Sequence, residues 1–203
     1  MAYASTASGH AAHPAQINSS TGLASRKLAF WTFIGAECLI FGGMIGTYLA
    51  YKGNSISGPY PHEILNIPLT SFSAFVLLMS SLTMVLGLGG VQRADQKSAT
   101  TWIFATAALG LLFVGIQIYE FTHFYHQGLR LGTNLFGSSF FVLTGLHGAH
   151  VAFGVLWLAT LGLLSMRGKL GPERSLSVEI AGLYWHFVDV VWIVIFALIY
   201  LVQ

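Results

Sequence analysis

Five long apolar segments follow one another along the chain, separated by short polar stretches. A helix needs about 20 residues to cross a bilayer, and each segment is long enough. Lipid offers the backbone no hydrogen-bond partners, so segments this apolar must be helical. Their continuous rather than alternating apolar character argues against a β-barrel. We therefore expect transmembrane helices near residues 28–51, 68–91, 100–122, 136–164 and 178–201.

The predicted fold is all-α, an integral membrane bundle of five transmembrane helices formed by residues 28–203. Residues 1–27 are mostly small and polar and lack the basic and apolar regions of a secretory signal, so we expect a disordered tail. No repeat or second domain is evident.

Composition supports a protein dissolved in lipid. Hydrophobic residues make up 55 % of the chain, charged residues only 8 %, and the mean hydropathy is +0.70. A soluble domain is about one-quarter charged. The net charge of +2 with scattered basic residues gives no reason to expect a nucleic-acid partner. The single cysteine, Cys38, lies in an apolar segment, excludes an intrachain disulfide, and is expected to be a small buried side chain.

The basic residues predict an orientation. With five spans, the N-terminus and the second and fourth connections share one side of the membrane. That side carries Arg26, Lys27, Arg93, Lys97, Arg167, Lys169 and Arg174. The other side carries only Lys52 and Arg130. The positive-inside rule then predicts a cytoplasmic N-terminus and a C-terminus outside.

Small residues recur at helical spacing. The first span holds Gly42 and Gly46, and the fourth holds Thr144, Gly148 and Ala152 four residues apart. Such rows let helix backbones approach closely in lipid. They predict tight packing, within this chain or against a partner.

Seven ionisable side chains lie within or at the ends of the predicted spans. They are Glu37, Glu120, His147, His150, Glu179, His186 and Asp189. A charge at the centre of a membrane helix costs about 2.5–3.5 kcal/mol on insertion scales, so each is a candidate functional residue. Glu37 falls near the middle of its span, and Glu120 at the outer end of the third.

Metal binding is a weaker interpretation of these residues. The pairs His147/His150, His186/Asp189 and Glu120/His123 are each three apart and share a helix face. A di-iron bundle needs two Glu-x-x-His motifs and two more carboxylates. This chain has one such motif, and His123 is expected at or beyond the end of its helix. We expect no metal site and, without a nucleophile, phosphate-loop or CxxC motif, no catalytic residue in this chain.

Several longer motifs resemble subunit III of heme-copper respiratory oxidases. They are "AECLIF", "GPYPHEILNIPLT", "LLMSSLTM", "GIQIYEF", "LFGSSFFVLTGLHGAHVAFG" and "VEIAGLYWHFVDVVWIVIFALIY". The resemblance covers roughly residues 28–201 and fits the bacterial five-helix form, without the two extra N-terminal helices of the longer form.

The resemblance implies an accessory, non-redox subunit of a proton-pumping terminal oxidase in a bacterial cytoplasmic membrane. Such a chain carries no cofactor itself, binds phospholipid, packs on subunit I, and supports proton uptake and stability during turnover. Heme and copper are then expected in partner subunits. The implied partners are subunit I, subunit II and a small subunit IV.

The resemblance also implies roles for residues. Glu37 matches a membrane-embedded acid that modulates protons or lipid, although a protonated, hydrogen-bonded glutamate fits equally well. Arg167 matches an arginine that meets a lipid headgroup, and an ordinary positive-inside residue is the alternative. The remaining matches predict a structural polar network, in which Asp189 orients His186 or a neighbouring helix. That network comprises Glu120, His147, His150, Glu179, His186 and Asp189.

Three alternatives stay open from sequence. The parent oxidase takes electrons from cytochrome c or from quinol, and family frequency weakly favours cytochrome c. The chain could instead be a free-standing membrane metalloenzyme, or an independent proton or ion pathway through Glu37 and Asp189. Prolines at 14, 59, 61, 68 and 172 leave the spans unbroken, which argues against a transporter.

Overall fold

The computed structural model describes residues 25–52 and 65–202, and all of their regular structure is helical. The predicted tail up to residue 24 and the segment with Pro59 and Pro61 lie outside the described residues. The five long helices are α1 (Ser25–Tyr51), α3 (Ile67–Gln92), α4 (Gln96–His126), α5 (Leu135–Met166) and α6 (Ser175–Phe196). A 3-10 turn, Pro172–Arg174, precedes α6, and a π-helical turn, Ala197–Leu201, follows it. The five long helices are each long and apolar enough to cross a membrane, which confirms the predicted all-α bundle of five transmembrane helices.

Helices α1, α3, α4 and α5 cover their predicted spans, whereas α6 ends at Phe196 and the π-helical turn completes the span predicted to reach residue 201. Polar side chains cap the starts of α3, α4 and α5. Asn66 accepts a hydrogen bond from the backbone N–H of Leu69, and Asp95 accepts one from Ser98. Such caps satisfy N–H groups that the first turn leaves unpaired. The difference is largest in α4, which runs four residues further at each end than hydropathy indicated. Gly128, at φ 89°, ends it in a conformation that L side chains rarely adopt.

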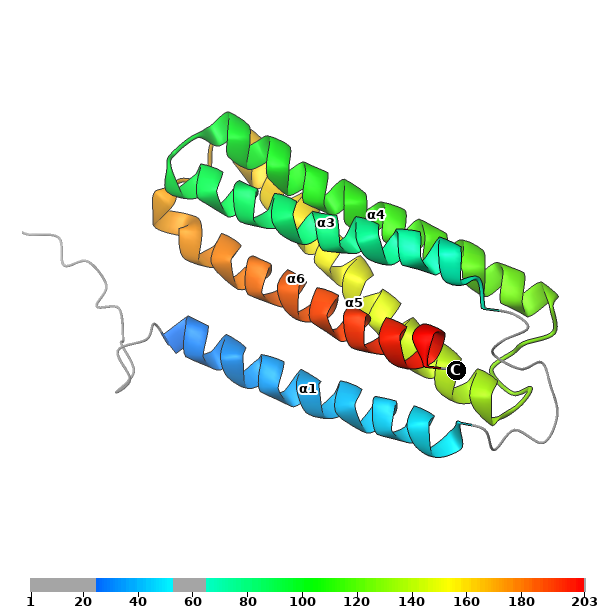
Figure 1. The fold of residues 1–203 in the computed structure, drawn as a ribbon. Helices are drawn as coiled ribbons and strands as arrows, with labels where there is room; N and C mark the ends of the chain where they lie inside the picture. Colours follow the sequence, from blue (N-terminus) through cyan, green and yellow to red (C-terminus); the bar gives the residue numbers. More distant parts are fainter. Residues whose placement is uncertain (1–24, 53–64, 203) are drawn as a thin grey trace, which may run out of the picture.

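The helices form a bundle in which sequence neighbours α3, α4, α5 and α6 run antiparallel and α1, at one edge, runs parallel to α6 (Figure 1). α3 and α4 run side by side, α5 packs against α4, and α6 contacts α3, α5 and α1. The chain direction brings the starts of α1, α4 and α6 and the ends of α3 and α5 together (Figure 1). We call this the basic end, because it carries Lys27, Arg93, Lys97, Arg167 and Arg174 among others.

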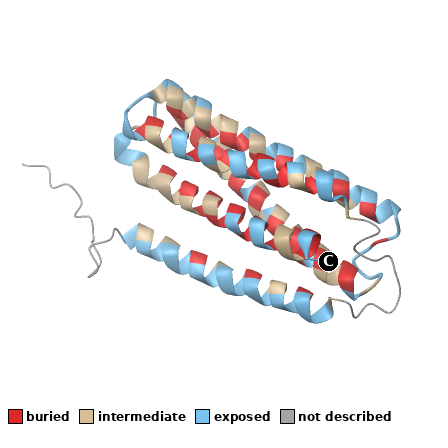
Figure 2. Cartoon of the chain, viewed as in Figure 1, coloured by how far each residue is buried: buried red, intermediate tan, exposed pale blue. Residues whose placement is uncertain are grey.

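α1 touches the bundle along a narrow stripe. Its buried residues are Ile34, Phe41 and Tyr48, spaced seven apart, and most of its surface is exposed in Figure 2. A seven-residue spacing gives a single seam of contact, as in a coiled coil. Polar contacts add to this seam at both ends: Lys27 pairs with Glu179, and the Lys52 ammonium donates to the carbonyl of Val202.

Glycines allow the other helices to approach closely. A Cβ on Gly90 would lie 2.6 Å from the backbone nitrogen of Ala99, at the start of α4. One on Gly110 or Gly154 would meet the ring of Trp185, which is fully buried. Glycine is therefore required at these contacts, where helix and ring leave no room for a methyl group.

The first predicted small-residue row behaves differently. A Cβ on Gly42 or Gly46 would meet nothing within 4 Å, so this GxxxG pair makes no close contact within the described chain. In the second row, Gly148 does sit at a contact, with the Gln117 side chain 2.5 Å from its position for a Cβ. Cys38, expected to be buried, is exposed on the surface of α1, so that expectation was wrong for the isolated chain.

The close approach at Gly90 generates a test. Replacing Gly90 with Ala forces apart two backbones that cannot yield, and we expect a loss of about 1–3 kcal/mol in folding free energy. Gly43→Ala is the matched control, because its Cβ enters open space and alanine is the better helix former. Thermal unfolding of the purified protein in mild detergent should show a lower Tm for Gly90→Ala alone. Equal Tm values for the two variants would contradict the packing described.

Candidate functional site

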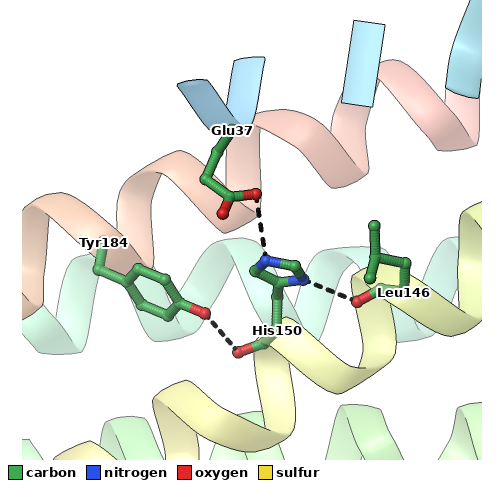
Figure 3. Close-up of polar contacts among 4 residues, drawn as sticks. All are labelled: Glu37, Leu146, His150 and Tyr184. Atoms are coloured by element: carbon green, nitrogen blue, oxygen red, sulfur yellow. Dashed lines mark hydrogen bonds and ion pairs between the residues drawn. The ribbon is translucent and has the colours of Figure 1, made fainter. Parts of the chain in front are cut away.

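The central candidate site joins three helices around His150 (Figure 3). Glu37 projects from the middle of α1, and its Oε2 lies 3.3 Å from His150 Nε2 on α5. His150 Nδ1 lies 2.9 Å from the Leu146 carbonyl, one turn earlier on α5. The Tyr184 hydroxyl of α6 donates to the His150 carbonyl at 3.0 Å. The sequence indicated Glu37 and His150 separately; the structure pairs them.

The two side chains face each other within the bundle. His150 Nδ1 faces a carbonyl oxygen, so it carries a hydrogen there and leaves Nε2 directed at Glu37. Glu37 Oε2 lies 3.3 Å from Nε2 and has no hydrogen-bond partner in the described chain. Polar groups are costly within a membrane, so each of these side chains favours the other as its neighbour.

An apolar groove opens beside this pair between α1 and α5. Its cavity volume is about 500 Å³. Aromatic rings form much of the lining, with the His150 imidazole and the Tyr184 hydroxyl as its polar groups. The ring-bearing residues are Phe30, Phe33, Phe153, Trp157 and Tyr184. A groove of this chemistry suits an acyl chain better than a polar substrate.

A second polar group lies between α3 and α6. His186 Nδ1 is 2.5 Å from the Ser81 hydroxyl, and the Trp185 indole donates to the Ser80 hydroxyl at 2.8 Å. Asp189 is 3 % exposed, and neither carboxyl oxygen has a hydrogen-bond partner in the described chain. The Ser81 side chain lies close to it. Of the two expected neighbours of Asp189, His186 or another helix, the structure places Ser81 of α3 beside it, and Ser81 also contacts His186.

Glu120 and Thr70 form a third polar contact, between α4 and α3. The Thr70 hydroxyl donates to Glu120 Oε1 at 2.5 Å, and both residues are buried. Sequence placed Glu120 at the outer end of its span and His123 at or beyond the end of its helix. The helix end was predicted too early, because α4 continues to His126. His123 is exposed and bonds to Gln127 instead of facing an acidic partner.

The remaining candidate residues, His147, Glu179 and Arg167, differ in the contacts that they make. His147 is fully buried with its ring stacked on Trp192, centroids 4.9 Å apart, and neither ring nitrogen has a hydrogen-bond partner among the described residues. Glu179 bonds to Lys27 at 2.5 Å at the basic end. Arg167 is exposed immediately after α5, at the basic end.

Ligand clusters for a metal are absent from the part of the chain that the structure describes: no three His, Cys, Asp or Glu side chains gather there. The partners that sequence reasoning missed are Ser81, Thr70, Lys27 and Tyr184. Hydroxyl groups are ordinary in membrane helices, so no sequence signal set these apart. Lys27 could have been matched to Glu179, since both lie at the same predicted end.

Comparison with known proteins decides the family. A family model described as cytochrome c oxidase subunit III matches residues 17–203. The chain belongs to this family.

Individual relatives agree with the subunit III assignment but differ in the oxidase they name. The chain is similar to cytochrome c oxidase subunit 3 of Bacillus sp. strain PS3, at 39 % identity over 87 % of this chain and 86 % of the relative. It is also similar to quinol oxidase subunit 3 of Bacillus spizizenii, at 38 % identity over 95 % and 96 %. A probable quinol oxidase subunit 3 of Staphylococcus saprophyticus is 39 % identical over 87 % and 88 %.

The resemblance to subunit III of heme-copper oxidases is thereby confirmed. The chain is a subunit of a heme-copper terminal oxidase complex and a multi-pass protein of the bacterial inner membrane. Subunit III implies partner subunits, which complete the enzyme.

The Glu37–His150 pair can be tested by a double-mutant cycle. Glu37→Leu leaves His150 without its partner in a low-dielectric site, and we expect a loss of about 1–3 kcal/mol in stability. Adding His150→Leu should recover part of that loss, because no polar group is then left unpaired. Thermal unfolding in detergent gives the coupling, and Cys38→Leu controls for added apolar surface on α1. Strictly additive losses would show that the two side chains do not interact.

Proposed function

We propose that the chain is the accessory, non-redox subunit III of a proton-pumping terminal oxidase of the cytochrome c oxidase type. It packs on subunit I, contacts subunit II and a small subunit IV, and leaves the heme and copper to its partners. The observation that carries the proposal is the family match over residues 17–203, joined to a described chain without a metal-ligand cluster.

The polar contacts support a structural role for most of the intramembrane ionisable groups. Glu120 and His186 bond to α3, Glu179 bonds to α1, and His150 of α5 faces Glu37 of α1. Interhelical hydrogen bonds in membranes average about 0.6 kcal/mol. We therefore assign these groups to fixing which helices are neighbours more than to raising stability.

The groove and Arg167 support the proposed lipid binding. The aromatic groove beside Glu37 accepts an acyl chain, and the exposed Arg167 guanidinium suits a phosphate headgroup. A lipid bound in this groove would change the surroundings of the Glu37 carboxyl. We therefore assign Glu37 the role of a membrane-embedded acid whose proton is sensitive to bound lipid.

The orientation we propose places the basic end in the cytoplasm. Seven basic residues of the sequence belong to this end and two to the other. The N-terminus is then cytoplasmic and the C-terminus outside.

The alternative function is subunit III of a quinol oxidase. It is favoured by relatives of that name at 38 % and 39 % identity, as similar as the cytochrome c oxidase relative. The donor site belongs to another subunit, so only the assembled enzyme decides. The complex purified through this chain should oxidise reduced cytochrome c faster than a quinol. The reverse preference would establish the alternative.

The accessory role predicts the effect of removing the chain. An oxidase lacking it should retain its heme content and its initial rate of oxygen consumption, yet lose activity several-fold sooner during continuous turnover. An oxygen electrode records both quantities on one sample, with the complete complex as control. Loss of heme, or an immediate loss of rate with unchanged lifetime, would contradict a non-redox, turnover-protecting role.

A further inference from the structure

A small cavity lies between α3 and α6, towards the basic end. Its volume is about 120 Å³. Apolar residues line most of it, while Glu179 and His186 supply its polar groups. The apolar lining includes Met84, Leu88 and Leu183. A water molecule needs about 10–15 Å³ of such volume and two or more polar partners, so water fits this cavity.

The cavity begins near the surface. The Glu179 side chain is 37 % exposed and belongs to the first turns of α6. His186 follows seven residues later on the same face, and Asp189 three residues after that. At 1.5 Å per residue, Glu179 and Asp189 are separated by about 15 Å along the helix.

Beyond the cavity, polar contacts continue to Asp189. His186 Nδ1 lies 2.5 Å from the Ser81 hydroxyl, and the same side chain lies close to Asp189. Neither Asp189 oxygen has a hydrogen-bond partner in the described chain, although the residue is 3 % exposed. A buried carboxyl without a donor is costly, whereas bridging water would satisfy it.

The polar series stops at Asp189. Residues 190–199 contain no ionisable side chain, and Trp192, the next polar group of α6, is buried with its indole nitrogen unpaired in the described region. On α6 the series therefore reaches Asp189 from the basic end and goes no further.

We propose that the α3–α6 interface is a hydrated, closed-ended proton-exchange site. Water enters beside Glu179, fills the cavity at His186, and reaches the un-ionised carboxyl of Asp189 past Ser81. The carboxyl proton exchanges with this water, one proton leaving the carboxyl oxygen as another arrives, with no net charge moved. This site differs from the Glu37–His150 pair and does not depend on the proposed role in turnover.

The charged and titratable groups of the neighbouring helices have other contacts, so Glu179 and His186 are the ionisable groups that line the cavity. On α1, Lys27 pairs with Glu179 and Glu37 faces His150. On α5, His147 stacks on Trp192. The α3 residues lining the cavity are apolar.

Infrared spectroscopy of the tagged chain, purified in mild detergent with its native partners, tests the site. The carbonyl stretching band present in the natural protein and lost in Asp189→Asn belongs to the un-ionised Asp189 carboxyl. On transfer from H₂O to D₂O, this band should shift promptly.

Blocking variants then test the route. A side chain at Gly182 enters the cavity, since its Cβ would lie 3.3 Å from the end of Met84, so Gly182→Leu should slow the shift about tenfold or more. Leu88→Trp, on the opposite wall, provides a second block should Gly182→Leu fail to assemble. Gly115→Leu is the matched control, because its side chain enters open space.

A prompt shift that only the blocking variants slow would support the site. Three results would overturn it: no band lost in Asp189→Asn, a band that ignores D₂O, or equal exchange rates in Gly182→Leu, Leu88→Trp and Gly115→Leu.

Discussion

The structure depends on one constraint: a polar group within a membrane must find its partner inside the protein. Hydrocarbon stabilises no unpaired donor or acceptor, so several buried polar side chains bond to a neighbouring helix, whereas His147 and Asp189 have no hydrogen-bond partner among the described residues. Glu37 selects α5, Glu120 selects α3, and His186 selects α3 through Ser81. The Gln117 amide likewise donates to the Thr144 carbonyl of α5 at 2.7 Å. These contacts are individually weak, yet together they favour one arrangement of five otherwise similar apolar helices.

Helix α1 packs against the rest of the bundle in a different way from that in which α3, α4, α5 and α6 pack against one another. α3, α4, α5 and α6 approach closely through glycines, and Trp185 fills the space between Gly110 and Gly154. α1 rests on a single seam, with lysines at its two ends and the Glu37–His150 pair near its middle. The exposed GxxxG face of α1 remains available for lipid or a partner subunit. This asymmetry makes α1 the helix most dependent on its surroundings in the assembled oxidase.

Much of the fold could be predicted from sequence, because long apolar segments permit only helices in lipid. The rotation of each helix about its own axis, which decides the residues that face the core, could not be predicted. In α1, exposed Leu39 and Ile40 are as apolar as buried Ile34 and Phe41, since lipid-facing and core-facing surfaces share one chemistry. Cys38 was misplaced for this reason. The end of α4 near His123 was predicted too early because hydropathy falls before the helix ends, and the hydroxyl partners Thr70 and Ser81 carry no distinguishing pattern.

We propose that this chain is a structural subunit whose polar residues hold helices together rather than bind metals. The most direct test is a reduced-minus-oxidised optical spectrum of the tagged chain, pulled down from native membranes in mild detergent and measured again after its partners are stripped. We expect heme bands in the complex and none in the stripped chain. Heme or another metal centre that stays with the isolated chain would contradict the account and make the residues around His186 and Asp189 a redox site.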